Sequence, residues 1–359
     1  MKILLVNNLI SYTYNFRREI IEALVGEGHE VIVVASDDDR EKLNELTKSC
    51  RFIDVAFSGK GTDIRRELSL LSKYRRIIRK ERPDFVFTFT IKMNLYCGLV
   101  CRRYHVPYVP MITGLGELER KGRLRPLLTA LHRIVMPHAE AVIFQNTDNR
   151  DFFDEHKIRY RKAVLLPGSG INVEKFAYRE YPAGDVVNLA FLGRIIKAKG
   201  VEEYFACAEE LASDTLVFHA AGPLGDEYRE RVTDLVKRGK LIYEGVISDS
   251  RDYLASSSVL VLPTFHPEGL SNAILEANAV GRPVICTPRT GCKEIVTDGV
   301  NGFYCREKNK EDLEKVILHF ASLPLSIRAG MGRKGRQIVV DRFDRRIVVD
   351  GYLSILEGK

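Results

Sequence analysis

Two glutamates lie eight positions apart in the segment TFHPEGLSNAILEANAVG, which spans residues 264–281. Glu268 precedes a Gly-Leu-Ser-Asn turn, and Glu276 lies about one turn inside the helix that the following apolar periodicity predicts. The N-terminus of a helix presents unpaired amides and a positive dipole end, which favour phosphate. Carboxylates on either side can accept hydrogen bonds from sugar hydroxyls. The pattern therefore indicates a site for a nucleotide sugar.

Two cations follow another predicted strand. Arg194 comes directly after the run 187–192 and Gly193, and Lys199 lies five residues further on. Breaking a sugar–diphosphate bond leaves negative charge on the departing phosphate, which fixed cations and backbone donors can stabilise. Arg can bind two phosphate oxygens at once, whereas Lys supplies a point charge. An exposed basic helix start is the alternative interpretation.

The run Asp37-Asp38-Asp39 offers a different way to stabilise a leaving phosphate, through a divalent metal. The run directly follows a predicted strand at residues 30–35, where a solvated acidic loop is the ordinary finding. We favour the acidic loop and expect no metal and no other cofactor.

Motifs along nearly the whole chain resemble those of the retaining glycosyltransferases of family 4, in the bacterial branch that elongates lipid-linked sugars. The two glutamates and the pair Arg194 and Lys199 belong to this resemblance. The other matching segments are Tyr14-Asn15-Phe16-Arg17, Gly28-His29-Glu30-Val31, Thr113-Gly114-Leu115-Gly116, Gly168-Ser169-Gly170, Gly281 to Ile285, Gly291 to Val296, Asp298-Gly299 and Asn301-Gly302-Phe303. The resemblance implies the GT-B fold, with two Rossmann-like parallel-sheet domains, an interdomain cleft and a C-terminal helix that crosses back to the first domain.

The resemblance also implies roles for the donor-side residues. Arg194 and Lys199 contact the donor diphosphate, Glu276 binds both ribose hydroxyls, and Glu268 binds hydroxyls of the transferred sugar. Glu268, Arg194 and Lys199 are thus the expected catalytic residues. The further donor-binding candidates lie in the same two loops and are Gly193, His266, Gly269, Leu270, Ser271 and Asn272.

The first domain is expected to carry the acceptor. Lys92 follows the predicted strand 85–90, where many relatives have a histidine that this chain lacks. It is a candidate for a diphosphate contact, with a surface lysine as the alternative. Thr113 and Gly114 resemble a glycine loop that closes over the transferred sugar, with a plain turn as the alternative. The first loop, residues 7–14, lacks the G-x-G of many relatives, and Asn15 and Arg17 are its polar candidates.

Alternating strands and helices predict an α/β protein with parallel sheets. The predicted strands are 2–6, 30–35, 85–90, 106–111, 141–145, 163–166, 187–192, 215–220, 240–243, 258–262 and 283–286. The clearest predicted helices are 15–26, 63–81, 124–136 and 345–356. A Gly-, Pro- and polar-rich segment at 167–184 is expected to be a linker. It separates a first domain, 1–170 with about 343–359 crossing back, from a second domain at 185–342.

Composition fits this organisation. The 359 residues suit two domains. No apolar run is long enough to span a membrane, and MKILLVNNLI is expected to be a buried strand rather than a signal peptide. Seven scattered cysteines indicate a reduced, cytoplasmic protein.

The net charge of +7 is carried by the first half, in which residues 1–180 hold 31 Lys and Arg against 23 Asp and Glu. No nucleic-acid module is recognisable, and Trp is absent. Two patches, residues 73–82 and 120–128, mix cations with Leu and Ile. They predict reversible docking to the anionic inner face of the cytoplasmic membrane, with solvated helix faces as the alternative.

Together these features predict a retaining glycosyltransferase. It is expected to move a hexose or N-acetylhexosamine from a nucleotide diphosphate donor, UDP-linked in our interpretation, to a polyprenyl-diphosphate-linked saccharide. Two other functions stay open at this point: a nucleotide-sugar epimerase of the same fold, and a non-catalytic nucleotide-sugar-binding partner of another transferase.

Overall fold

The computed structural model describes residues 1–56, 64–118, 122, 124–266 and 269–358, without the side chains of residues 64–66 and 117. The chain divides into two compact units. Unit 1 comprises Met1–Gly170 together with Arg345–Lys359, and unit 2 comprises Ile171–Asp344.

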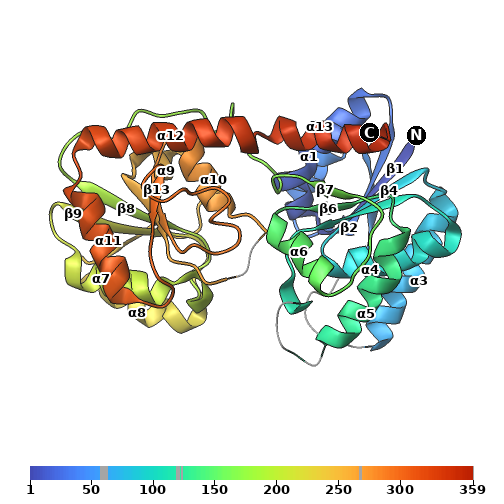
Figure 1. Ribbon diagram of the computed structural model, residues 1–359, viewed down its shortest axis with the longest axis horizontal. Helices are drawn as coiled ribbons and strands as arrows, with labels where there is room; N and C mark the ends of the chain where they lie inside the picture. Colours follow the sequence, from blue (N-terminus) through green and yellow to red (C-terminus); the bar gives the residue numbers. More distant parts are fainter. Residues whose placement is uncertain (57–63, 119–121, 123, 267–268, 359) are drawn as a thin grey trace. The chain divides into compact units, whose positions relative to one another are not determined.

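Unit 1 contains a seven-stranded parallel sheet with the order β3-β2-β1-β4-β5-β6-β7 (Figure 1). Its inner strands are continuous Val-, Ile-, Leu- and Phe-rich runs, as burial on both faces requires. The strands are β1 (Lys2–Leu9), β2 (Glu30–Ser36), β3 (Arg51–Asp54), β4 (Phe85–Phe89), β5 (Tyr108–Ile112), β6 (Val142–Phe144) and β7 (Ala163–Leu165).

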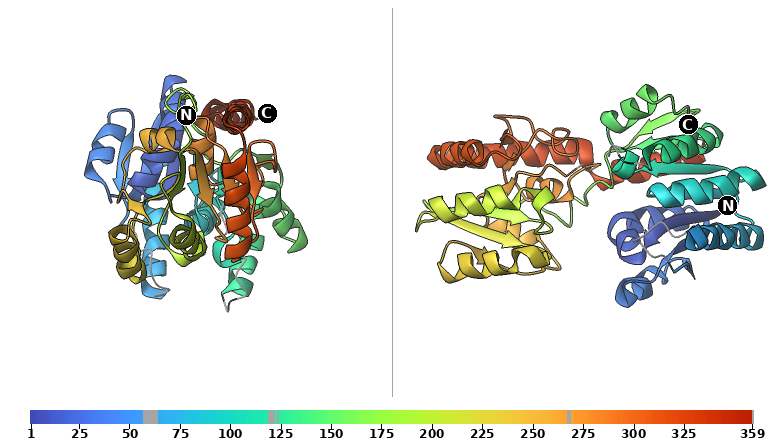
Figure 2. Two further views of the ribbon diagram at one scale, coloured as in Figure 1. Left: turned by 90° about the vertical axis from the view of Figure 1, so that its left-hand side faces the viewer. Right: turned by 90° about the horizontal axis from the view of Figure 1, so that it is seen from below.

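Helices cover both faces of this sheet (Figure 2). One buried cluster joins the sheet to α3, α4, α5 and α6, and a second joins it to α1, α2 and α13. The helices are α1 (Ile10–Gly26), α2 (Arg40–Leu46), α3 (Ile64–Glu81), α4 (Ile91–Tyr104), α5 (Arg125–Val135), α6 (Thr147–Glu155) and α13 (Arg345–Leu356), with short 3-10 helices η1 (Gly116–Leu118) and η2 (Met136–His138).

The last helix, α13, packs in unit 1, which confirms that the C-terminal helix returns to the first domain. Val348 and Tyr352 are buried in the cluster with α1. The Tyr352 ring lies 4.9 Å from that of Phe87, between ring centroids. At the start of the helix, Arg345 Nη1 donates to both carboxylate oxygens of Glu19, at 2.9 and 2.8 Å.

Unit 2 contains a six-stranded parallel sheet with the order β10-β9-β8-β11-β12-β13. Its strands are β8 (Val187–Leu192), β9 (Leu216–Ala221), β10 (Ile242–Tyr243), β11 (Val259–Leu262), β12 (Val284–Cys286) and β13 (Gly302–Tyr304). Its helices are α7 (Val201–Leu211), α8 (Arg229–Lys237), α9 (Arg251–Ser256), α10 (Asn272–Ala279), α11 (Lys310–Ser322) and α12 (Leu325–Phe343), with 3-10 helices η3 (Lys197–Lys199) and η4 (Asp226–Tyr228).

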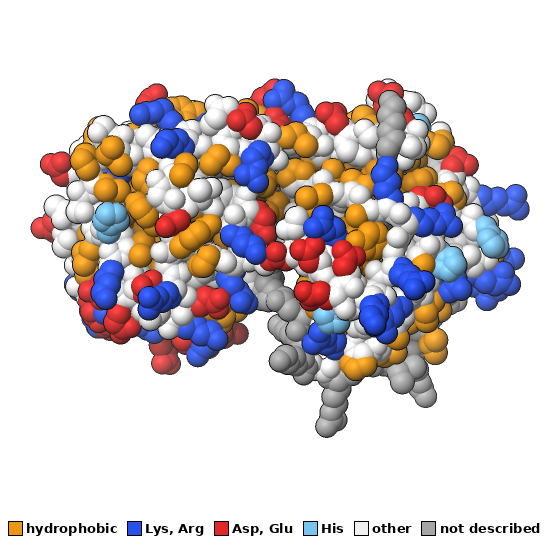
Figure 3. All heavy atoms as spheres, in the orientation of Figure 1, with side chains coloured by type: hydrophobic (Ala, Val, Ile, Leu, Met, Phe, Trp, Pro, Cys, Tyr) orange, Lys and Arg blue, Asp and Glu red, His pale blue; other side chains and the backbone are white. Residues whose placement is uncertain are grey.

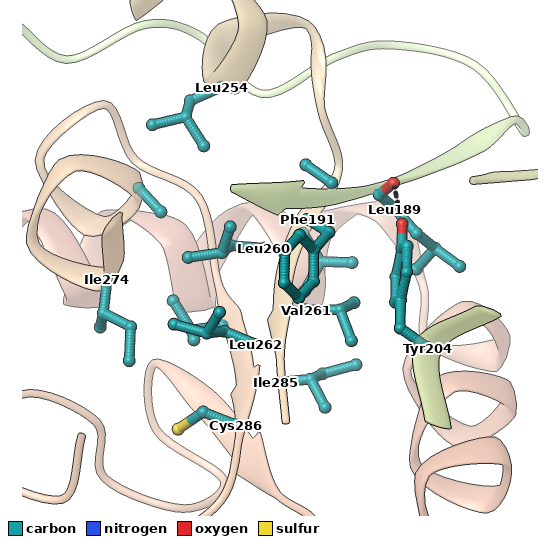
Figure 4. Close-up of a cluster of buried hydrophobic side chains, with 14 of the residues drawn as sticks. Leu189, Phe191, Tyr204, Leu254, Leu260, Val261, Leu262, Ile274, Ile285 and Cys286 are labelled. Carbon is teal, nitrogen blue, oxygen red and sulfur yellow. Dashed lines mark hydrogen bonds between the residues drawn. The ribbon is translucent and has the colours of Figure 1, made fainter. Parts of the chain in front are cut away.

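The core of unit 2 is one continuous cluster, part of which is drawn in Figure 4. Tyr204 is fully buried there, and its hydroxyl donates to the carbonyl oxygens of Leu189 and His219, both at 2.8 Å. The phenol thereby satisfies its polar end while its ring fills the space beside β8, as a buried tyrosine must.

Three sequence-based expectations are corrected. Residues 7–14 do not form a loop, because β1 continues to Leu9 and α1 begins at Ile10. The edge strands β3 and β13 were missed, since short runs with polar residues carry little periodic signal. The predicted linker at 167–184 contains the boundary between the units, but its part from Ile171 onwards belongs to unit 2, because Ile171 and Val173 are buried in the core of that unit.

The buried guanidinium of Arg282 explains why this segment is held. It donates to the carbonyl oxygens of Arg179 and Glu180 at 2.9 and 2.7 Å. The Gly-Arg-Pro-Val-Ile motif therefore fastens the start of unit 2 to its own sheet. Among the described helices, none combines the length and apolar character needed to cross a bilayer.

A buried histidine makes unit 1 sensitive to acid. His132 of α5 has no exposed surface, its Nδ1 donates to the carbonyl oxygen of Leu128 at 2.7 Å, and its Nε2 has no partner among the described residues. Burial lowers the pKa of His132 to about 4. The unfolded chain, with a histidine pKa near 6.5, binds more protons below that pH, so stability falls as pH decreases from about 6.5 towards 4.

We expect this group to reduce the free energy of unfolding by about 2 kcal/mol between pH 8 and pH 5. Urea unfolding of the wild type and of His132→Leu at both pH values measures the difference, because the other titrating groups are common to both proteins. An equal pH dependence of the two proteins would contradict the assignment.

Candidate functional site

The sheet of unit 2 fixes the position of the donor-side residues. Chain order runs outwards from β8 through β9 to β10 on one side, and from β11 through β12 to β13 on the other. The order therefore reverses between β8 and β11. Ligands of such open parallel sheets bind beyond the carboxyl ends of the strands at this switch point. The segments that follow β8 and β11, residues 193–200 and 263–271, both carry predicted site residues.

Glycine allows these two segments to touch. Gly200 has a φ of +75°, and a Cβ atom there would lie 2.1 Å from the carbonyl oxygen of Pro263. A similar approach occurs next to β9, where a Cβ on Gly222 would lie 2.0 Å from the carbonyl oxygen of Gly193. Both contacts are too short for any side chain, so the backbone itself forms the floor of the site.

Hydrogen bonds fix the loop after β11 to the loop after β8. The carbonyl oxygen of Ala198 accepts from the amide of Phe265 at 3.0 Å and from the hydroxyl of Thr264 at 3.2 Å. Thr287, after β12, donates its hydroxyl to the carbonyl oxygen of Thr264. The amide of His266 in turn donates to Thr264 Oγ1 at 3.1 Å. The loop is thus held from both sides.

The predicted cations lie on this framework. Arg194 is exposed, and its Nη2 lies 3.5 Å from Nε2 of His266. Lys199 is buried in the turn before α7, with only 8% of its surface exposed. Arg194 and His266 are therefore brought together, whereas Lys199 is held where its backbone already bonds to Ile196, with an N···O distance of 3.0 Å.

The N-terminus of α10 follows the same loop. Leu270 is 9% exposed and Ser271, the N-cap residue, is 1% exposed. The amide of Ser271 donates to the carbonyl oxygen of Gly291 at 2.9 Å. The backbone amide of Ser271, one of the predicted donor-binding residues, is therefore engaged within unit 2. The amides of the first helical turn, beginning at Asn272, have no acceptor inside the helix.

Glu276 lies on α10, and a residue that the sequence did not single out positions it. Ser250 Oγ donates to Oε2 of Glu276 at 2.6 Å. Ser250 is the residue immediately before α9, so its hydroxyl comes from a different loop of unit 2. One serine among many carries no pattern, and only the folded chain brings it to the carboxylate. Glu268, the other predicted carboxylate, lies outside the described residues.

In unit 1 the equivalent switch point lies between β1 and β4. Thr90, directly after β4, has a φ of +69°, which is unusual for a β-branched residue. Lys92 follows in the first turn of α4, and its Nζ is paired with Oε1 of Glu67 at 2.7 Å. A diphosphate that binds Lys92, as predicted, would therefore have to share its ammonium group with the carboxylate of Glu67.

Arg17 lies in the interior of unit 1, with 4% of its surface exposed. Its guanidinium donates to the carbonyl of Phe16 and to Ser169 Oγ at 2.8 and 2.9 Å, and its Cζ lies 4.6 Å from the ring centroid of Phe89. Burial is the main reason that its pKa lies below the usual arginine value. The carbonyl of Asn15 accepts from Arg345 at 3.2 Å, so this predicted pair also holds the Gly-Ser-Gly segment and α13.

The predicted glycine loop follows β5. Thr113 and Gly114 are half-buried, and Gly114 and Gly116 have φ values of +154° and +49°. The geometry explains the glycine at Gly116, because the left-handed region disfavours other side chains. Leu115 between them is buried in the core.

The aspartate run is built into the fold of unit 1. Asp37 accepts from Arg40 at 2.9 Å, Asp38 accepts from the hydroxyl of Ser11, and Asp39 caps α2 by accepting from the amide of Lys42 at 3.1 Å. Each aspartate thus has a local structural partner. Across the part of the chain that the structure describes, no group of three or more His, Cys, Asp or Glu side chains is arranged to hold a metal ion.

Comparison with known proteins agrees with this architecture. Residues 16–174 match the family described as Glycosyltransferase Family 4, and residues 187–322 match Glycosyl transferases group 1. The chain is 24% identical to the N,N'-diacetylbacillosaminyl-diphospho-undecaprenol alpha-1,3-N-acetylgalactosaminyltransferase of Campylobacter jejuni, over 96% of this chain and 95% of that protein. It is also 24% identical to the capsular polysaccharide biosynthesis glycosyltransferase CapM of Staphylococcus aureus, over 98% and 97% of the two chains.

Solved structures share the fold. Anabaena Alr3699/HepE in complex with UDP and glucose superposes with a TM-score of 0.80 at 16% identity, over the whole of both chains. The lipopolysaccharide outer core galactosyltransferase WaaB gives a TM-score of 0.71 at 15% identity, over 100% of this chain and 99% of that one. Two Rossmann-like parallel sheets and these neighbours define a GT-B protein. The chain is a retaining glycosyltransferase of family 4.

Gly200 provides a test of the contact between the two loops. Gly200→Ala would combine an unfavourable φ with a clash against Pro263, whereas Gly239→Ala shares a similar φ of +67° but meets no atom within 4 Å. We expect Gly239→Ala to lose about 1–2 kcal/mol of unfolding free energy and Gly200→Ala to lose about 2 kcal/mol more. Urea unfolding measures both, and equal losses would exclude the clash.

Proposed function

We propose that this protein transfers a hexose or N-acetylhexosamine from a UDP-linked donor to a saccharide carried on a polyprenyl diphosphate, with retention of configuration. The supporting observation is the backbone contact at the switch point of unit 2, which joins the segment that carries Arg194 and Lys199 to the loop that precedes α10. These cations and the first-turn amides suit a diphosphate. UDP is present in the HepE complex, and the name of the Campylobacter protein specifies an undecaprenyl-diphosphate-linked acceptor.

In this mechanism unit 2 binds the donor. Arg194 and Lys199 stabilise the negative charge that develops on the departing UDP, so cationic side chains supply what a metal supplies elsewhere. Glu276 accepts hydrogen bonds from the ribose hydroxyls, and Glu268 from the transferred sugar. His266, Gly193 and the loop of Gly269, Leu270 and Asn272 complete the donor side.

The acceptor is assigned to unit 1, through Lys92 and the Thr113-Gly114 loop, with Asn15 and Arg17 as supports from α1. The acceptor hydroxyl attacks the donor sugar on the face that the diphosphate leaves, and the leaving phosphate accepts the proton. Because the acceptor is lipid-linked, the reaction takes place at the cytoplasmic face of the membrane. Products of this kind feed surface polysaccharide or glycan assembly.

A panel of UDP-sugars, each with and without a polyprenyl-diphosphate saccharide, tests the proposal. UDP release that depends on the acceptor supports transfer. Isomerisation of the donor alone would indicate an epimerase, and donor binding without turnover would indicate a binding partner of another enzyme. Either of the last two results would refute the proposed reaction.

Substitution of Lys199 distinguishes a specific role of this lysine at the donor site from a general effect of positive charge. Lys199→Ala should lower kcat/KM by about 10²–10³-fold, because the leaving phosphate loses one preorganised cation. Lys197, two residues away, is exposed and paired with Glu202 at 3.2 Å, so Lys197→Ala is the matched control and should retain near-normal rates. Steady-state kinetics with the best donor decides, and a Lys199→Ala enzyme with unchanged kcat/KM would remove this residue from the site.

Ser250 and Glu276 should act as a pair on the donor. Glu276→Ala should abolish measurable turnover, since the ribose loses both hydrogen bonds. Ser250→Ala keeps the carboxylate but removes this hydrogen bond to it, at a cost of about 1–1.5 kcal/mol, so the donor KM should rise about tenfold with little change in kcat. Ser250→Thr keeps the hydroxyl and should restore the KM. A normal donor KM in Ser250→Ala would show that the 2.6 Å bond does not position Glu276.

A further inference from the structure

The basic excess of the chain is concentrated in three helices on one face of the sheet of unit 1. The helices α3, α4 and α5, called here the basic helix layer, contain twelve Lys and Arg against two Glu, Glu67 and Glu81. Their surplus exceeds the net charge of +7 of the whole chain. On the opposite face, α1, α2 and α13 hold six Lys and Arg against five Asp and Glu. The helix α6 packs on the same face as the basic helix layer but holds one Arg against four Asp and Glu, so the positive charge belongs to these three helices and not to unit 1 as a whole.

The helix α5 has a second apolar face, of which the core covers only Leu131. Its inward side is formed by Thr129, His132 and Val135, which are buried. Four aliphatic side chains at the spacing of one helical face, called here the aliphatic stripe, are Leu124, Leu127, Leu131 and Ile134. Leu124, Leu127 and Ile134 are 39%, 57% and 42% exposed, and Leu131 is half-buried.

Charged side chains of α5 lie to one side of this stripe. Arg125 and Arg133 are the charged residues between positions 124 and 134, and both contact His156 beyond α6: Arg125 Nη2 lies 2.5 Å from its Nε2, and Arg133 Nη2 donates to its carbonyl at 2.7 Å. Contact with water gives no reason for the surface of a helix to be aliphatic rather than polar. The exposed stripe therefore needs another explanation.

One cation of the neighbouring helix α4 lies next to the stripe, and further cations lie on α3, which packs against α4. Arg102, at the end of α4, reaches the carbonyl oxygen of Ile134 at 3.5 Å. Arg75 of α3 donates to the hydroxyl of Tyr104 in α4 at 2.9 Å. Arg76 and Arg79 of α3 are exposed as well. Figure 3 shows Lys and Arg side chains interspersed with hydrophobic ones over the part of unit 1 where Figure 1 places α3 and α5.

We propose that the basic helix layer is a docking surface for an anionic lipid bilayer, with the aliphatic stripe inserted among the acyl chains. Cations at the headgroup level and aliphatic side chains below them are the combination that an interfacial helix uses. The inference rests on the proposed function, because a polyprenyl-linked acceptor lies in such a bilayer. The sequence assigned the patches 73–82 and 120–128; the structure moves the apolar contact to positions 124–134, and residues 120, 121 and 123 lie outside the described part.

Two other occupants fit the surface less well. A second copy of the chain would bring two strongly basic layers together, and like charges oppose such contact. Nucleic acid would match the cations, but single-stranded forms bind through aromatic stacking, and the stripe offers only Leu and Ile.

Sedimentation with vesicles tests the surface in the absence of donor and acceptor. The full chain should bind phosphatidylglycerol vesicles at 0.15 M salt and should bind phosphatidylcholine vesicles at least tenfold more weakly. Leu127→Ser with Ile134→Ser should lower the affinity for phosphatidylglycerol at least tenfold, because apolar area is no longer transferred from water. Leu318→Ser, at a 46% exposed position on α11 in unit 2, is the matched control and should bind normally.

A charge variant provides an independent measurement. Arg76→Glu with Arg79→Glu should also weaken binding at least tenfold and reduce its salt dependence. Equal binding of the wild type and both double variants to phosphatidylglycerol vesicles would overturn the proposal. It would also be overturned by a concentration-dependent dimer, or by binding to RNA, that the Leu127/Ile134 variant abolishes. UDP release with a short-chain, water-soluble acceptor should be unchanged in these variants. Vesicle binding without any turnover would refute only the proposed reaction, and turnover without vesicle binding would refute only the docking surface.

Discussion

The carbonyl oxygen of Ala198 accepts two hydrogen bonds from the loop after β11, and two residues later Gly200 lies against the backbone of Pro263. These contacts, which are main-chain contacts except for the hydrogen bond from the Thr264 hydroxyl, join the segments that leave the two strands at the switch point. A side chain at Gly200 would separate them, because there is no room for a Cβ atom. Arg194 and Lys199 belong to the first segment and α10 follows the second, so this close backbone contact helps to fix where the cations and the helix start lie.

The charged side chains and the helix start of the candidate site are likewise held by a few specific contacts. Arg194 is exposed near His266, while Lys199 is enclosed by the turn that carries it. The first residue of the helix start is already committed, since the amide of Ser271 bonds to Gly291 and ties α10 to the loop after β12. A ligand therefore meets a helix whose cap is fixed in advance. Hydrogen-bond donors that are already fixed in position need no rearrangement when negative charge develops on a leaving group.

The sequence predicted the two parallel sheets well, because inner strands such as β1, β2 and β8 are long apolar runs between helical patterns. It failed where periodic signal is weak, at the four-residue β3 and the three-residue β13, and it ended β1 three residues early. Motif residues such as Arg194 and Glu276 could be found because their types and spacing carry chemistry. Ser250 could not, since its contact with Glu276 joins a loop to a helix, at residues 26 positions apart in the chain. Likewise, the burial of Arg17 and the pairing of Lys92 with Glu67 depend on packing that residue types do not encode.

The two units share the parallel-sheet architecture but differ in where their positive charge lies. In unit 2, Arg194 and Lys199 lie at the switch point, where a small anionic ligand binds to a parallel sheet. In unit 1, the cations near the carboxyl edge are compensated internally: Lys92 pairs with Glu67, and Arg345 pairs with Glu19. The excess of positive charge in unit 1 lies instead on the basic helix layer of α3, α4 and α5, which also carries the aliphatic stripe. A compact anion needs convergent cations, whereas an extended anionic surface needs cations spread over a broad face. The distribution in unit 1 is of the second kind, which is why a lipid surface accounts for it better than a second small ligand.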